Sequence, residues 1–244
     1  MTTRPISQST RNPWIAGPRA IFVRSGLTAM LYLAGGVPLV FAVAFALSRL
    51  PWHTDLFENP ILGLGSFVIV SAGGGWLWGR TLERLTAQSR SGRLAWPVAV
   101  SFPIISIAAA MALGQLERFL VEDGGAGDLP LYLVFAVLFT LSSFAVVAAM
   151  GGVIGLALRN GWLAGELAFF GGLAGGAGFL LADVIQHLLG RVVGGPNAAQ
   201  TATMLTVMAI GHAVAAFTGG GVIGWRLTVS QHHSTPVEQA NVPQ

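Results

Sequence analysis

The chain has 244 residues, of which 53% are hydrophobic and only 9% are charged, and its formal net charge is +3. A soluble domain carries about 25% charged residues, so most of this surface cannot face water. The basic residues are all arginines, and they fall in the termini and at the ends of apolar runs, so nucleic acid is not expected as a partner. The absence of cysteine excludes disulfides, thiolate catalysis and Cys-ligated metals.

Apolar runs of about 20 residues, the length that crosses a bilayer, recur along the chain. They predict an all-α integral membrane protein with six transmembrane helices near 26–49, 61–81, 95–116, 130–158, 163–189 and 202–225. The first run is longer than the apolar core of a signal peptide, so we expect it to remain as a span. The expected organisation is an N-terminal segment (1–24), a transmembrane domain (25–228) and a C-terminal tail (229–244).

Arginine predicts the orientation of these spans. Residues 1–24, the 80–93 loop, Arg159 and Arg226 fall at one set of span ends, and most acids fall at the other. The positive-inside rule then places both termini in the cytoplasm, in a membrane that we expect to be a bacterial inner membrane. Tryptophans gather at the same arginine-bearing ends as an expected interfacial belt, namely Trp14, Trp76, Trp78, Trp96, Trp162 and Trp225.

A pattern of glycine and arginine repeats three times. Arg-Ser-Gly or Arg-Asn-Gly opens the first, third and fifth spans, and a pair of glycines four residues apart ends each even span. These pairs are Gly75/Gly79, Gly151/Gly155 and Gly220/Gly224. The repeat starts lie about 65–70 residues apart, which suits a helical hairpin. The sequence therefore predicts three hairpins in the same orientation.

The fifth span is crowded with glycine. Gly171/Gly175 and Gly172/Gly176 both have the small-xxx-small spacing that lets membrane helices approach closely. We expect these four glycines, with the three pairs above, to form helix-packing faces. Their abundance also suggests contacts with other membrane protein subunits.

Ionisable groups inside the spans are few, and each has a structural and a functional interpretation. Asp183 and His187 lie four residues apart on one helix face, where they form either a packing pair or a proton relay or ligand contact. His212, near the middle of the last span, either hydrogen-bonds Thr140, Ser142 or Ser143 or binds a solute. A haem or chlorophyll-type pigment on His212 is an alternative that the sequence does not favour. Glu166 is expected to be a hydrated acid at a helix start.

No catalytic motif stands out. The stretch GHAVAAFTGGG resembles the histidine-bearing span of rhomboid proteases, but Thr140-Leu141-Ser142-Ser143-Phe144 stands where that family needs Gly-x-Ser-Gly. The leading hypothesis is a non-catalytic multi-spanning subunit that packs within a larger membrane assembly. A small-solute transporter or membrane substrate-binding module is the first alternative, and an intramembrane enzyme is the second.

Overall fold

The computed structural model of the chain describes residues 17–35, 60–85, 93–122, 125, 130–193 and 200–233. Within these residues it describes all side chains except those of 60–62, 121–122, 131, 187–193, 200–208 and 231–233. This described part forms six α-helices and two π-helical segments and contains no strand. The predicted all-α class is confirmed.

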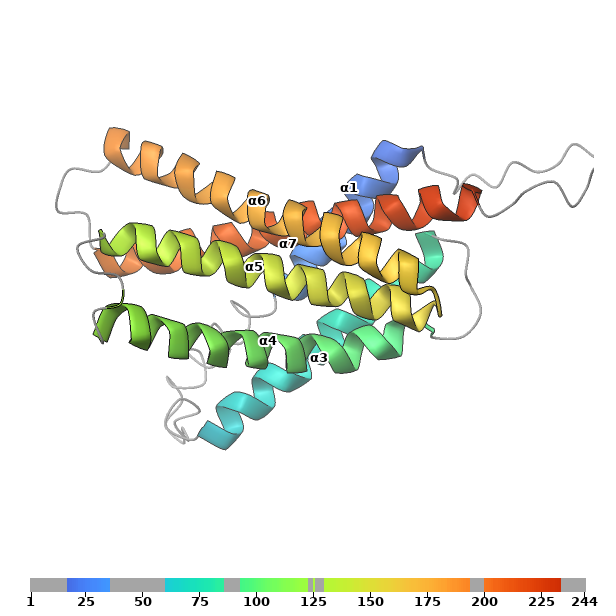
Figure 1. Cartoon of the computed structure of the whole chain (residues 1–244), viewed down its shortest axis with the longest axis horizontal. Helices are drawn as coiled ribbons and strands as arrows, with labels where there is room; N and C mark the ends of the chain where they lie inside the picture. Colours follow the sequence, from blue (N-terminus) through green and yellow to red (C-terminus); the bar gives the residue numbers. More distant parts are fainter. Residues whose placement is uncertain are drawn as a thin grey trace, which may run out of the picture.

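Five of the helices follow predicted apolar runs, but the first begins at Pro18, within the segment 1–24 that was expected to precede the first span (Figure 1). The helices are α1 (Pro18–Ala29), continued by a π segment (Met30–Ala34), α3 (Pro60–Leu85), α4 (Ala95–Glu117), continued by a π segment (Arg118–Glu122), α5 (Leu131–Ala157), α6 (Gly161–Val193) and α7 (Gln200–His233). Three stretches are long and apolar enough to cross a membrane, namely Ala95–Leu120, Tyr132–Ala157 and Gly161–Gln186. The prediction of a membrane protein with transmembrane helices is confirmed to that extent. Residues 36–49 of the expected first span lie outside the described residues.

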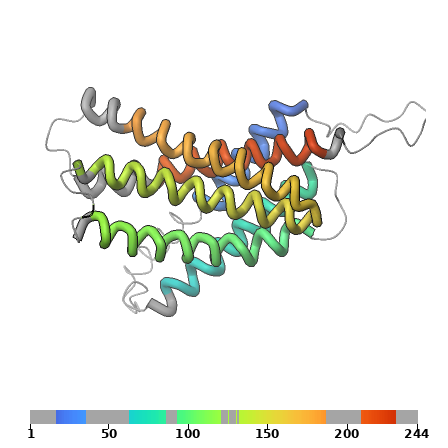
Figure 2. Tube along the Cα trace, viewed as in Figure 1, coloured from blue at the N-terminus to red at the C-terminus, as the bar shows by residue number. Residues whose placement is uncertain are grey.

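The helices form a closed ring. Each of α3 to α6 contacts the next helix along the chain, α7 returns to contact α1, and α1 contacts α3 (Figures 1 and 2). Helices α3, α5 and α7 end at the same end of the bundle at which α4, α6 and α1 begin (Figure 1). We call this end of the bundle, which carries Arg80, Arg93, Arg159 and Arg226, the arginine-rich end.

One type of helix contact occurs three times at the arginine-rich end. In each case a pair of glycines lies directly against two small residues, four apart, on the helix that begins there. A Cβ on Gly79 would lie 2.6 Å from Ala95 Cα, and one on Gly75 would lie 3.2 Å from Ala99 Cα. The same arrangement joins Gly151 and Gly155 of α5 to Ala168 and Ala164 of α6, and Gly220 and Gly224 of α7 to Ala29 and Ser25 of α1. The backbones are too close at these points for any larger residue.

The glycine-rich middle of α6 lies between α5 and α7. Gly172 and Gly176 face Phe144 of α5, and Gly171 faces Ile223 of α7. Gly175 meets Val147, also on α5. The four glycines are therefore used for contacts within the chain.

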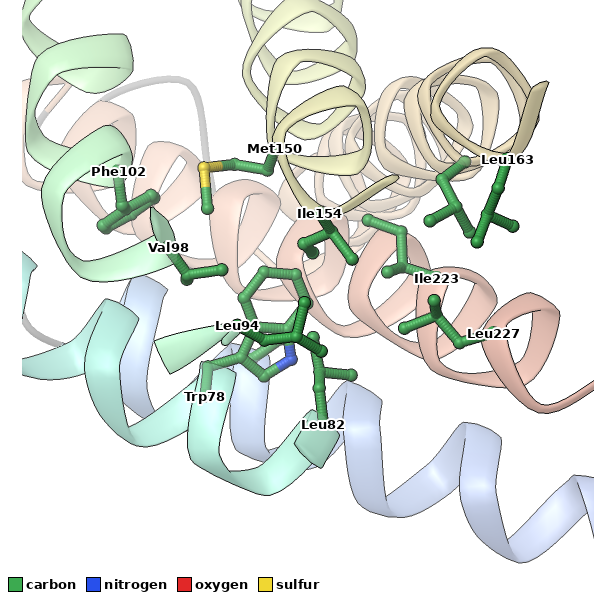
Figure 3. Packing of buried hydrophobic residues seen from close by; sticks show 12 residues of the cluster. Trp78, Leu82, Leu94, Val98, Phe102, Met150, Ile154, Leu163, Ile223 and Leu227 are labelled. Atoms are coloured by element: carbon green, nitrogen blue, oxygen red, sulfur yellow. The ribbon is translucent and has the colours of Figure 1, made fainter. Parts of the chain in front are cut away.

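The hydrophobic core occupies the half of the bundle near the arginine-rich end. Figure 3 shows how its side chains pack. Trp78 of α3 is its largest member and is only 1% exposed. The same cluster contains Leu94, which precedes α4, Val98 of α4, Ile154 of α5 and Ile223 of α7. The assignment of Trp78 to an interfacial belt is therefore wrong, because its indole fills the space between the helices. Trp96 and Trp162, by contrast, are 67% and 85% exposed.

The opposite half of α4 is packed much less. From residue 110 to residue 119 every side chain is exposed except Leu113, which is half-buried. Ten residues cover almost three helical turns, so this stretch exposes side chains on every side. None of its side chains is fully buried by the described part of the chain. We call residues 110–119 the open segment of α4.

Candidate functional site

The most buried acid in the described part of the chain is Glu83, near the end of α3. Its side chain is 3% exposed, and its Oε1 accepts hydrogen bonds from the backbone N–H groups of Leu94 (2.8 Å) and Ala95 (3.2 Å). Arg80 Nη1 donates to the other carboxylate oxygen at 3.0 Å. A carboxylate at this place satisfies donors that the first turn of α4 leaves free and suits the positive end of its dipole.

Glu83 was not among the residues expected to be functional from the sequence. Its signal was present, because Glu83 is the only acid in the arginine-bearing 80–93 loop and lies twelve residues before Ala95, where a span starts. A carboxylate that caps a helix from another helix has no fixed spacing, unlike a local N-cap. Only the docking of α3 on α4 brings it into place.

Glu166 of α6 pairs with Arg226 of α7. Arg226 Nη1 lies 2.8 Å from Glu166 Oε1, and the two side chains are 25% and 22% exposed. The guanidinium also lies over the ring of Phe170, 4.1 Å from its centroid, and 5.0 Å from that of Trp225. Glu166 is therefore not simply a hydrated acid at a helix start; it joins α6 to α7 through an arginine stacked on aromatic rings.

We predict that Glu166 and Arg226 are energetically coupled. A double-mutant cycle of Glu166→Gln and Arg226→Gln, measured by unfolding in detergent, should give a coupling of about 1 kcal/mol. As a control, Arg24→Gln removes an exposed arginine from α1 and should show no coupling to Glu166→Gln. Equal coupling in both cycles would mean that net charge, and not this contact, is being measured.

His212 of α7 lies among aromatic side chains. Its ring meets Phe179 of α6 at 5.2 Å and Phe139 of α5 at 6.0 Å between centroids, both edge to face. The hydroxyls of Thr140 and Ser143 are buried and have no hydrogen-bond partner among the described residues. Neither of them therefore hydrogen-bonds His212, although the sequence had suggested both as partners. The imidazole instead takes part in the packing of α5, α6 and α7.

Asp183 and His187 lie on α6 toward the end opposite the arginines. Asp183 is half-buried, and the side chain of His187 lies outside the described residues, so the expected pair is not described. Over the described part of the chain, no three histidines or acids come together as a metal site. The structure thus brings Asp183 and His212 into no common metal-binding group.

Two hydroxyls, one buried and one half-buried, donate hydrogen bonds between helices. Ser25 Oγ of α1 donates to the carbonyl of Gly220 at 2.6 Å, and Thr218 Oγ1 of α7 donates to the carbonyl of Ala174 at 2.7 Å. Both lie beside glycine contacts, because a backbone carbonyl can be reached across a helix interface only where the neighbouring chain comes close. These hydrogen bonds hold α7 against α1 and against α6.

No family model, curated protein or solved structure matches this chain. Four of the described polar side chains join one helix to another: Glu83 caps a helix, Glu166 pairs with an arginine, and Ser25 and Thr218 donate to a carbonyl of a neighbouring helix. The buried hydroxyls of Thr140 and Ser143 make no such contact.

Proposed function

We propose that the protein is a non-catalytic six-span subunit of a larger membrane assembly, built from three helical hairpins that close into a ring. The observation that carries this proposal is the use of four buried or half-buried polar side chains for helix–helix contacts. Glu83, Glu166, Ser25 and Thr218 each join one helix to another. A transporter or an enzyme needs such groups to face a ligand instead.

The threefold occurrence of the glycine contact supports the three hairpins. It joins α3 to α4, α5 to α6 and α7 to α1, which are the junctions between one proposed hairpin and the next. Because the third junction returns to the first helix, three equivalent hairpins would form a ring without a free edge. The six proposed spans place both termini on one side, and the arginines at that side favour the cytoplasmic face of a bacterial inner membrane.

The partner surface is proposed to be the open segment of α4. The glycine faces, which suggested subunit contacts in the sequence, are already occupied by helices of this chain. The open segment has an exposed Gln115 and a Gly114 with no heavy atom within 4 Å of an added Cβ. An amide and a small residue on an uncovered helix suit a helix of another protein, because lipid satisfies no amide hydrogen bond.

We test this proposal with a photo-cross-linking amino acid placed at Gln115 or at Met111, both in the open segment. In native membranes these positions should give one discrete cross-linked protein that also co-purifies in mild detergent at a fixed ratio. Leu181, exposed on α6 toward the same end, is the matched control and should cross-link to lipid only. Equal protein cross-linking from all three positions would contradict the proposal.

His212→Gln separates this proposal from the solute-binding alternative. The substitution keeps a donor and an acceptor but removes titration, and loss of one membrane hydrogen bond costs about 0.6 kcal/mol on average. The variant should assemble normally with little loss of stability. A variant that assembles but loses a co-purifying solute or pigment would overturn the subunit function in favour of ligand binding.

A further inference from the structure

A pocket of about 250 Å³ opens at the arginine-rich end between the start of α4 and the end of α5. It is lined by Arg93, Ala157, Leu158 and Arg159. Arg93 and Arg159 are both exposed, and neither forms an ion pair within the described residues. Two exposed arginines and two apolar residues therefore line a small hollow.

Arg159 occupies a backbone position that normally belongs to glycine. Its φ is 58°, and it is the one non-glycine residue with a positive φ in the described part of the chain. The N–H of Arg159 donates to Leu156, and the N–H of Asn160 donates back to Gly155, which is the Schellman pattern at the end of a helix. Arginine is strained in this left-handed conformation and glycine is not. Strained backbone positions of this kind occur often at ligand sites, which makes the Arg159 side chain a candidate ligand group.

Two exposed tryptophans mark the depth of the pocket. Trp96 follows Arg93 by three residues on α4, and Trp162 follows Arg159 by three residues on α6. Exposed tryptophan prefers the headgroup level of a bilayer. Basic pockets between transmembrane helices at that level bind anionic headgroups, and guanidinium groups bind phosphate by paired hydrogen bonds.

We infer that Arg93 and Arg159 hold the phosphate of an anionic phospholipid headgroup, with Trp96 and Trp162 beside its glycerol and acyl region. The apolar Ala157 and Leu158 line the same pocket, as suits a ligand that is part phosphate and part hydrocarbon. This inference does not depend on the proposed subunit function, because a lipid site is compatible with a transporter as well.

The test measures binding of phosphatidylglycerol and of phosphatidylcholine to the full chain in detergent at 0.3 M salt, which screens attraction between exposed charges. Native mass spectrometry counts retained lipid, and tryptophan fluorescence gives the Tm. The protein should retain phosphatidylglycerol in preference to phosphatidylcholine. Arg159→Gly and Arg93→Gln should each weaken phosphatidylglycerol binding by about tenfold or more, as expected for a charge-assisted contact.

Arg159→Gly contains its own folding control. Because glycine relieves the left-handed strain, the lipid-free Tm of this variant should equal or exceed that of the unmodified protein. Arg24→Gln removes an equal charge from α1, which does not line the pocket, and should change binding less than about twofold at this ionic strength. The inference is overturned if the two lipids bind alike, if Arg24→Gln weakens binding as much as Arg159→Gly, or if inorganic phosphate raises the Tm as far as the lipid does.

Discussion

Gly155→Ala should destabilise the protein by about 1–3 kcal/mol, the usual cost of overpacking a tight interface. A Cβ at Gly155 would overlap the backbone N and Cα of Ala164 on α6, and backbone atoms cannot move aside as a flexible side chain can. The helices α5 and α6 would have to separate over the whole contact. Alanine is the smallest substitution that tests this, and it is otherwise the better helix former.

Gly152→Ala is the matched control, on the same helix and three residues away. Nothing lies within 4 Å of a Cβ at Gly152, so only the helix propensity changes, and the stability should stay constant or rise by up to about 1 kcal/mol. Unfolding in mixed detergent micelles measures both variants against the unmodified chain. If both alanines shift the midpoint in the same direction by the same amount, the close approach of α5 to α6 is refuted.

Glu83→Ala should have an effect of comparable size. Leu94 and Ala95 are fully buried residues, and their backbone N–H groups would lose the carboxylate oxygen that accepts from both. A buried donor left without a partner costs about 1–3 kcal/mol. The start of α4 should therefore fray, with faster hydrogen exchange of these two amides and a lower midpoint of unfolding.

Glu83→Gln distinguishes the acceptor from the charge. Glutamine keeps an oxygen for the two N–H groups but loses the pairing with Arg80, whose side chain is 39% exposed, and the favourable term with the helix dipole. These contributions are small, about 0.3–1 kcal/mol for the dipole, so most of the stability should remain. A glutamine variant as unstable as the alanine variant would mean that charge, and not capping, is what Glu83 supplies.

The sequence showed which glycines would form packing faces, but not which residues they would contact or which tryptophan would be buried. The glycine pairs of even spans were visible in the sequence because their spacing of four is local to one helix. Their partners were not, since Ala164 and Ser25 are ordinary small residues until another helix meets them. Trp78 shows the same limit: near a span end, its sequence position is equally consistent with an interfacial tryptophan and with a core residue.

The length and hydropathy of the apolar runs determined the helical class and five of the helix locations, because these depend on transfer of short stretches from water to an apolar phase. The positions of the arginines determined the arginine-rich end. Tertiary structure alone decided which glycine meets which helix, that Glu83 caps α4, and that Arg226 reaches Glu166 across 60 residues. It also decided that Arg93 and Arg159 face one pocket. These contacts join residues distant in the chain, and no local periodicity records which faces of two helices will dock.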